Sequence, residues 1–280
     1  MSSILTNNSA MVALQTLKSV NNNLAKTQDQ ISTGKAVASA KDNSSVWAIS
    51  KVMEADVAGF KSVSESLALG QSTVAVASAG AEQIVEVMKE VKGLLVKAST
   101  ENVDFAKIQE DIAERMKGIS SIVAGSQFNG ANLLATDVDG AGGTSVSVVS
   151  SLDRVGSTNP TASYIQVDTV DFEAADFEGN LTAVADVTTA KTALGEIEGF
   201  LKTAIEGAAS LGASSKRLEG QQEFVGKLMD AMKSGIGSLV DADMEETSAK
   251  LQALQVQQQL ATQSLSIANQ APQSILSLFR

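Results

Sequence analysis

The chain has 280 residues, of which 44% are hydrophobic and 19% charged, so it should fold, and its 4% aromatic content and two prolines favour long helices over a compact mixed core. The 32 acidic and 21 basic residues give a formal charge of −11, which disfavours nucleic acid as a partner because phosphate contacts need a basic surface. Cysteine and histidine are both absent, which excludes thiol nucleophiles, Ser-His triads, disulfides, and zinc or haem sites built on these residues.

The first ten residues, MSSILTNNSA, contain no basic segment followed by an apolar core, and the chain has no apolar run of 18 or more residues. We therefore expect no conventional secretory signal and no membrane insertion. If the protein leaves the cell, another route must carry it.

The first forty residues predict a helix that packs against other protein, because apolar residues recur at alternating spacings of three and four and few charges interrupt them. The predicted seam comprises Ala10, Leu14, Leu17, Asn21, Leu24, Gln28 and Ile31. Residues 32–45 break this pattern with Gly34 and small polar side chains. They predict a connector, followed by a new helix that is capped by Asp42, Asn43 or Ser44.

A long rod is predicted next. Its heptad seam begins with Val46 and Ile49 and continues without proline to Ala98, broken only at Asp56 and Gly70. About 53 residues at roughly 1.5 Å each make a rod of about 80 Å, which needs companions along its length. After a break at 99–104, residues 105–125 predict a shorter helix antiparallel to the rod.

Residues 130–185 predict a small β region, with a Val-rich run at 145–149 and the best strand candidate at 163–172. The sequence GAGG at 140–143 is typical of a turn, whereas a phosphate loop would need a strand–loop–helix setting and a lysine. An acidic run in this region could suggest calcium, but it lacks the spacing and glycine of an EF-hand, and a solvated acidic rim is favoured. The run consists of Asp168, Asp171, Glu173, Asp176 and Glu178.

Residues 187–239 predict a second rod that matches the first in length and packs antiparallel to it by knobs into holes. Gly235 and Gly237 mark a change of register before the last helix, for which Asp241 and Asp243 are candidate caps. The carboxylates of DADMEE (241–246) could also form an acid–base dyad. Because no basic or nucleophilic companion accompanies them, capping is favoured.

Residues 251–280 predict a helix whose only charged side chain is Arg280. Its apolar stripe is Leu251, Leu254, Ala261, Leu265 and Ala268, and most other positions are amides or hydroxyls, which can be buried at lower cost than ions. We interpret it as a helix surrounded by protein; an uncharged surface helix is the alternative. The predicted fold is mainly α, with long antiparallel rods in a coiled-coil-like bundle, a small β region at the tip and paired terminal helices.

Three stretches resemble bacterial flagellin, the subunit of the flagellar filament: LAKTQDQISTGKAVASAKDN (24–43), IQEDIAERM with SQFNGANLL (108–116 and 126–134), and the C-terminal forty residues (241–280). The resemblance covers nearly everything outside about 135–185. It implies a terminal helical inner domain (1–40 with 241–280), a long-helix rod domain (41–134 with 181–240) and a small variable β-rich surface region (135–180).

The resemblance implies a structural subunit that self-assembles into an extracellular filament for swimming, with no enzymatic activity, cofactor, metal or catalytic residue. Implied partners are further copies, other flagellins, the flagellar type III export apparatus, a secretion chaperone, and the cap and hook-associated proteins. The expected assembly interface is Leu14, Leu17, Leu24, Ile31, Leu251, Leu254, Ala261, Leu265, Ile275, Leu278 and Phe279. The alternatives are a hook–filament junction protein of the same superfamily and a type III secreted coiled-coil protein. A peptidase of the zinc type is excluded because it needs histidine.

The resemblance also concerns a patch that an innate immune receptor recognises on many flagellins. Lys92 and Leu94 fit the pattern of the receptor-binding members, but Glu90 stands where they carry arginine and Gly118 where they carry glutamate. We therefore expect poor binding to that receptor, although the two changes could also be neutral surface substitutions.

Overall fold

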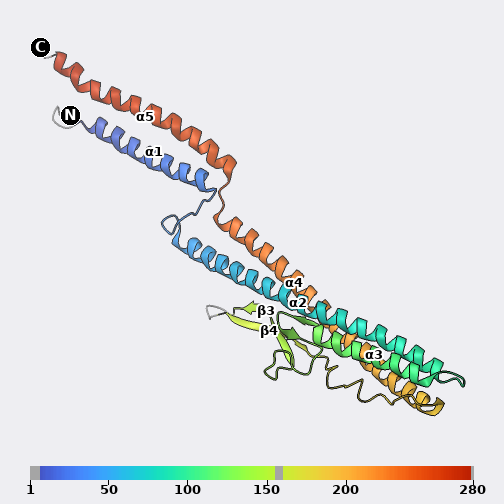
Figure 1. Ribbon diagram of the computed structural model, residues 1–280. Coiled ribbons are helices and arrows are strands. Elements are labelled where there is room, and N and C mark those ends of the chain that lie inside the picture. Colours follow the sequence, from blue (N-terminus) through green and yellow to red (C-terminus); the bar gives the residue numbers. More distant parts are fainter. Residues whose placement is uncertain (1–6, 155–159, 279–280) are drawn as a thin grey trace. The chain divides into compact units, whose positions relative to one another are not determined.

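The computed structural model describes residues 7–154 and 160–278, with the side chains of the last helix described as far as residue 270. The elements in chain order are α1 (Asn8–Thr33), α2 (Ser44–Ala98), α3 (Phe105–Gly125), β1 (Gln127–Phe128), β2 (Ala131–Asn132), β3 (Ser145–Asp153), β4 (Thr161–Asp168), α4 (Val187–Val240) and α5 (Met244–Leu278). Long helices dominate (Figure 1), which confirms the predicted mainly α fold with a small β region.

The chain forms two compact units. The terminal unit consists of Met1–Ala55 and Ala231–Arg280, and it contains α1, α5 and the adjoining ends of α2 and α4. The central unit, Asp56–Asp230, contains the remainder of α2 and α4 together with α3 and all four strands.

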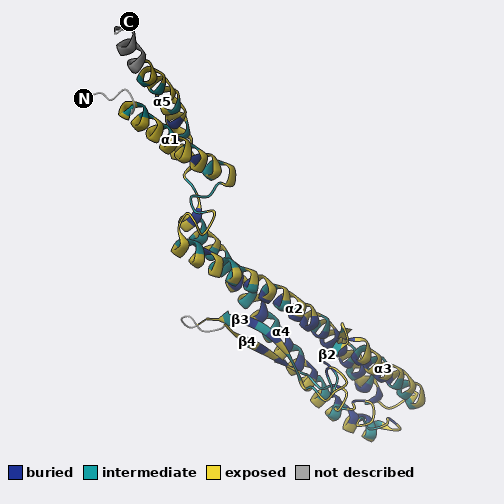
Figure 2. Ribbon diagram, turned by 90° about the vertical axis from the view of Figure 1, so that its left-hand side faces the viewer, coloured by how far each residue is buried: buried dark blue, intermediate teal, exposed yellow. Residues whose placement is uncertain are grey.

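The core of the central unit is built on the seam that the sequence predicts for α2. Every seam position from Phe60 to Ala98 is buried, including Gly70 (Figure 2). α4 contributes a buried residue at each seven-residue interval, and α3 adds one face of its helix. The α4 residues are Ala190, Ile197, Ala204, Leu211, Leu218 and Val225, and those of α3 are Ile112, Met116, Ile119 and Val123.

The β3–β4 hairpin packs along the side of α2. Val148 on β3 pairs with Ile165 on β4, both are buried, and Val148 reaches the backbone of α2 at Gly70. A Cβ at Gly70 would lie 2.5 Å from a Val148 methyl group, so the glycine permits the close approach. The predicted strands at 145–149 and 163–172 overlap β3 and β4, although residues 169–172 lie outside β4.

The glycine-rich segment 140–143 is a turn, as predicted, and it is closed by its own chain. Asp137 accepts hydrogen bonds from the backbone N–H groups of Gly140, Gly142 and Gly143, at 3.1, 2.7 and 3.1 Å. These donors are therefore not free for a phosphate group. The hydrogen bond from Gly142 is the largest of the contributions that hold the pKa of the Asp137 carboxyl below its usual range.

Two of the predicted caps are confirmed. Asn43 accepts a hydrogen bond from the backbone N–H of Val46 at 3.2 Å at the start of α2. Asp243 accepts hydrogen bonds from the N–H groups of Glu245 and Glu246, at 2.9 and 3.2 Å, at the start of α5. The Asp243 carboxylate therefore satisfies the start of α5, in line with the capping interpretation of DADMEE.

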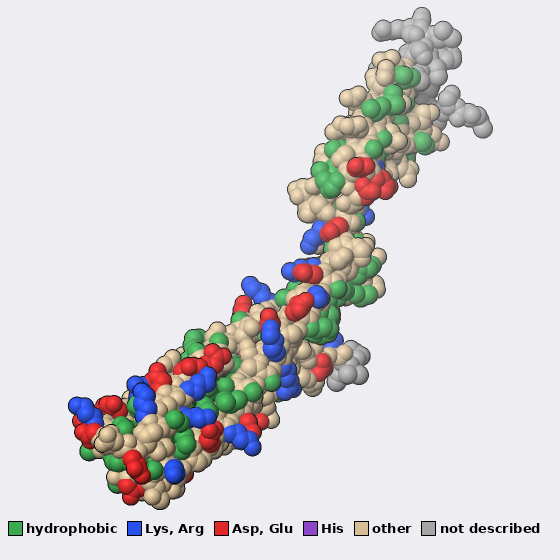
Figure 3. All heavy atoms as spheres, turned by 90° about the vertical axis from the view of Figure 1, so that its right-hand side faces the viewer, with side chains coloured by type: hydrophobic (Ala, Val, Ile, Leu, Met, Phe, Trp, Pro, Cys, Tyr) green, Lys and Arg blue, Asp and Glu red, His purple; other side chains and the backbone are tan. Residues whose placement is uncertain are grey.

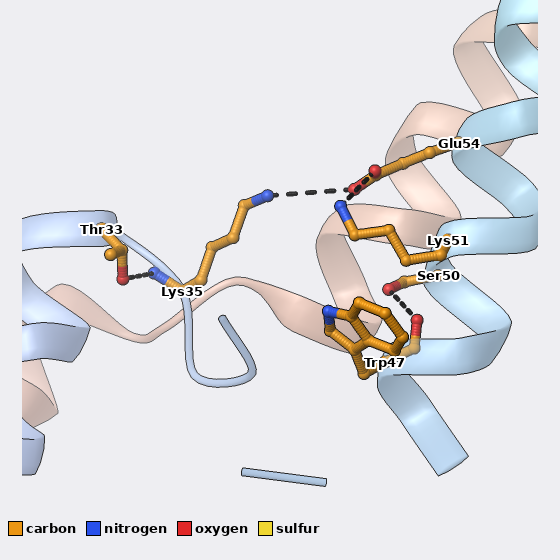
Figure 4. A network of polar contacts seen from close by, with 6 residues as sticks. All are labelled: Thr33, Lys35, Trp47, Ser50, Lys51 and Glu54. Atoms are coloured by element: carbon orange, nitrogen blue, oxygen red, sulfur yellow. Dashed lines mark hydrogen bonds and ion pairs between the residues drawn. The ribbon is translucent and has the colours of Figure 1, made fainter. Parts of the chain in front are cut away.

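The connector from α1 to α2 and the connector from α4 to α5 pair with each other inside the terminal unit. The N–H of Ala36 donates to the carbonyl of Val240 at 2.7 Å, and the N–H of Ala242 donates to the carbonyl of Gly34 at 2.9 Å. Side chains add to this joint (Figure 4), because Glu54 lies 3.9 Å from the Lys35 ammonium. The two connectors therefore form one hydrogen-bonded joint.

Candidate assembly interface

α1 and α5 lie side by side and antiparallel in the terminal unit (Figure 1). Side-chain amides join them: the Gln258 side chain donates to the Asn21 side chain at 2.8 Å, and the Asn7 side chain donates to the carbonyl of Ala268 at 2.8 Å. Asn7 also caps α1, since its side-chain oxygen accepts from the N–H of Ala10 at 3.0 Å. Neutral polar residues thus pair across the two helices.

The α5 stripe faces α1 as predicted. Leu254 and Ala261 are buried, and Leu251, Leu265 and Ala268 are half-buried. The α1 seam differs in part. Leu17, Leu24 and Ile31 are half-buried, but Leu14 is 58% exposed, and Asn21 and Gln28 are exposed as well. Their neighbours Ala13, Val20 and Thr27 are the less exposed residues, so these three occupy the places that the heptad pattern predicted for Leu14, Asn21 and Gln28.

Leu14 therefore lies outside the contact between α1 and α5, and this has a physical reason. The spacings 10–13–17 and 10–14–17 both fit a heptad, and the smaller Ala13 is the residue that lies against α5. In α2 the seam also shifts near its start, where Ile49 is 51% exposed and the neighbouring Ser50 is buried.

A band of large apolar side chains on α1 and α5 has no partner within the described residues. Their exposed fractions range from 55% to 65%. We call them the apolar band: Met11, Val12, Leu14, Val256, Leu260 and Ile267. Figure 3 shows how few charged side chains lie over this part of the surface. α1 contains three charged residues, and α5 contains none from Leu251 to Leu278.

A groove runs within this band between the two helices. Its volume is about 880 Å³, and Val12, Leu260 and Ile267 line it together with small side chains such as Ala13 and Ala261. Small residues between large ones create the holes that receive knobs from another helix. Burial of the exposed part of six side chains of this size contributes roughly 5–11 kcal/mol before the entropic cost of association. The geometry therefore suits helix-on-helix packing with further protein.

The remaining predicted interface residues lie at the C-terminal end. Ile275 and Leu278 belong to α5 beyond the point where side chains are described, and Phe279 lies outside the described residues. Sequence reasoning missed Val12, Val256, Leu260 and Ile267 as exposed apolar residues. Their exposure follows from the rotation of each helix about its axis, and the heptad pattern alone leaves that rotation undetermined.

The predicted receptor patch lies on α2 and α3 in the central unit, and its charges are paired within the chain. The Arg115 guanidinium forms an ion pair with Glu90. The Lys92 ammonium lies 2.5 Å from a carboxylate oxygen of Glu198. Leu94 and Gly118 are half-buried, and a Cβ at Gly118 would meet no atom within 4 Å. The two cations Lys92 and Arg115 are therefore both paired with carboxylates.

The described residues contain no group of three or more side chains that could hold a metal ion. No helix within the described ranges is long and apolar enough to cross a membrane. What these residues do present is a weakly charged helix pair with unpartnered apolar side chains.

Comparison with known proteins gives two family matches. Residues 4–138 match the bacterial flagellin N-terminal helical region, and residues 194–279 match the bacterial flagellin C-terminal helical region. The intervening residues 139–193 belong to neither match. They include both strands of the β3–β4 hairpin.

Several relatives, among them the following two, match along nearly their whole length. A flagellin from Brucella melitensis biotype 1 is 40% identical over 100% of both chains. Flagellin FljK from Caulobacter vibrioides is 39% identical over 100% of this chain and 99% of its own. Among solved structures, a protein assigned as a flagellar hook-associated protein from Vibrio parahaemolyticus has a TM-score of 0.52 at 13% identity and covers 71% of this chain and 100% of its own. This last likeness concerns the fold alone.

Proposed function

Because this chain belongs to the bacterial flagellin family, we propose that the apolar band of α1 and α5 is the surface through which it joins the filament. The protein is a structural subunit of the bacterial flagellar filament. The single observation that carries the proposed surface is the coincidence of unpartnered apolar side chains, from 55% to 65% exposed, with helices almost free of charge. In a filament these side chains would be buried against neighbouring copies.

The proposed interface also includes the buried and half-buried seam residues, because they hold the pair of helices together. These are Leu17, Leu24, Ile31, Leu251, Leu254, Ala261 and Leu265, with Leu14 contributing from the exposed side. Ile275, Leu278 and Phe279 extend the proposed interface to the C-terminus. The inner domain would comprise 1–40 with 241–280, the rod domain 41–134 with 181–240, and the surface region 135–180.

Further partners follow from the family. We propose passage through the flagellar export apparatus with a secretion chaperone, assembly beneath a cap protein, attachment to hook-associated proteins, and an extracellular position. A role in the hook–filament junction is the runner-up. It is not favoured, because both full-length relatives above are flagellins.

Seeded growth separates these two functions. Short filament fragments are mixed with concentrated monomer, and their length is followed by electron microscopy. A filament subunit elongates the seeds continuously. A junction protein adds a single layer and caps them, and that outcome would overturn the proposal.

For the receptor patch we propose weak recognition by the innate immune receptor for flagellin. Glu90 stands where receptor-binding flagellins carry arginine, so one cation is missing. A second cation, Arg115, is engaged in an ion pair with Glu90. The missing carboxylate at Gly118 removes an anion. Charged anchors of this kind often supply a large share of interface energy.

A further inference from the structure

The outer face of the β3–β4 hairpin and the neighbouring part of α4 enclose a shallow polar cavity of about 540 Å³. Its five lining residues are Ser147, Tyr164, Gln166, Asp168 and Arg217. The three β4 residues alternate with the buried Ile165 and Val167, so they share the outward face of the strand. Ser147 stands directly opposite Gln166 in the strand register.

No side-chain hydrogen bond or ion pair engages any of these five residues among the described parts of the chain. The cavity is therefore lined by five polar groups whose hydrogen-bonding capacity is not used within the described chain. They are a guanidinium, a carboxylate, an amide, a hydroxyl and a phenol. Elsewhere in the hairpin, polar side chains are engaged: Ser163, for example, donates to Asp153 at 2.5 Å.

The opposite face of the hairpin is fixed, which makes the cavity a preformed surface. Val148 sits against Gly70 of α2, and the Gln221 side chain on α4 donates to the carbonyl of Ser150 at 2.8 Å. That hydrogen bond holds β3 beside the helix that carries Arg217. Preformed polar groups lose little entropy when a ligand binds.

We propose that this cavity binds a carbohydrate, in the form of a neutral hexopyranose ring. The Tyr164 side chain is 58% exposed, so the face of its ring is available to the C–H groups of a sugar. Asp168 accepts from a sugar hydroxyl, while Arg217 and Gln166 donate to sugar oxygens.

The charge pattern argues for a polyol over other ligands. A phosphate would be repelled by the Asp168 carboxylate, and a basic peptide would be repelled by Arg217. Sugar hydroxyls both donate and accept, so they satisfy the two charges together.

Tyr164 is the only tyrosine in the chain, which permits a site-specific test. Full-length monomer that carries 3-fluorotyrosine gives a single ¹⁹F resonance from this cavity. It is titrated with maltotriose, cellotriose and chitotriose, each neutral, and separately with inorganic phosphate. We expect at least one trisaccharide to move the resonance in a saturable way at concentrations on the order of 1 mM, a range typical of weak binding.

Two neighbouring substitutions provide the matched comparison. Arg217→Gln removes the guanidinium and should weaken sugar binding about tenfold. Lys216→Gln removes the adjacent cation, which pairs with Glu219 at 2.7 Å and does not line the cavity, and should leave binding unchanged. The proposal is overturned by three outcomes: no response to any of the trisaccharides, a response to phosphate alone, or equal binding by wild type and Arg217→Gln.

Discussion

A methyl group of Val148 on β3 occupies the space that a side chain at Gly70 on α2 would need, 2.5 Å from the ideal Cβ position. The second methyl group and the Cβ of Val148 follow at 2.9 and 3.3 Å, so a rotation of the valine cannot clear the space. β3 itself would have to move. The hairpin is thus attached to the rod through a helix position that has no side chain.

We predict that Gly70→Ala destabilises the central unit although alanine is the better helix former. Overpacking typically costs about 1–3 kcal/mol, against a gain of about 1 kcal/mol in helix propensity, and a contact as close as 2.5 Å places the cost in the upper part of that range. Denaturant unfolding of the monomer measures the difference. Gly93→Ala in the same helix is the control, because its Cβ would meet no atom within 4 Å, and it should stabilise by about 0.5–1 kcal/mol. Equal stabilisation by both substitutions would show that the Val148 contact is unimportant.

The sequence predicts the packing face of α2 but not the individual contacts that it makes. The α2 seam is predicted correctly from Phe60 to Ala98, because the heptad repeat there leaves one apolar face. Gly70 stands in that seam as an apparent defect, and only the position of Val148, far away in the chain, explains it. Whether Leu14 or Ala13 lies against α5 cannot be read from the sequence, because two heptad phases fit equally well and α5 selects between them.

In the candidate assembly interface, too, some features can be predicted from the sequence and others cannot. Scarcity of charge in α1 and α5 is visible in the sequence, and it predicts helices suited to protein surroundings. Which apolar residues stay exposed, such as Leu260, depends on the rotation of one helix against the other. The ion pair between Glu90 and Arg115 depends on the register of α3 against α2, which no local pattern encodes.

Acid should destabilise the loop at 137–143 through Asp137. Its carboxylate accepts from four backbone N–H groups, with Gly142 contributing most, and its pKa is lowered in the folded state. The stabilisation is therefore fully present above the pKa of the unfolded chain, about 3.9, and is lost as the pH falls through the lower folded value.

Unfolding of wild type and Asp137→Asn at pH 6 and pH 3 measures this contribution. The stability gap between the two proteins should shrink at the lower pH. Asp139→Asn serves as a control for the loss of a neighbouring carboxylate, since that side chain accepts from two backbone N–H groups only. A gap for Asp137→Asn that is the same at both pH values would contradict the assignment.

Isolated monomer should leave roughly 1–40 and 241–280 disordered, because the apolar band has too few partners to repay the entropy of ordering. Limited proteolysis, followed by mass spectrometry, should trim both ends of the monomer to a stable core of rods. Filaments should resist the same treatment. Equal protection of the ends in monomer and filament would refute this expectation.

Leu260→Lys and Leu265→Lys should both abolish seeded elongation while the central unit stays folded. Leu260 lies in the apolar band and Leu265 in the seam with α1, and an unpaired charge buried at either position costs several kcal/mol. Elongation is scored by electron microscopy and folding by circular dichroism. Leu265→Met, which conserves volume, should assemble. Normal growth of both lysine variants would show that these residues remain exposed in the filament.

The unmodified protein should be a poor agonist of the innate immune receptor for flagellin. Loss of two charged contacts, at Glu90 and Gly118, is expected to cost about 2–4 kcal/mol, which is roughly a hundredfold in affinity. The double substitution Glu90→Arg with Gly118→Glu should restore activation in a reporter-cell assay with monomer. It releases Arg115 from its ion pair, and the new side chain at 118 has open space around its Cβ.

Glu86→Arg is the control. Glu86 lies one turn from Glu90 and pairs with Lys89, so this substitution tests whether added positive charge alone suffices, and it should give no gain. Full activity of the unmodified protein, or no gain in the double variant, would count against the assignment of this patch.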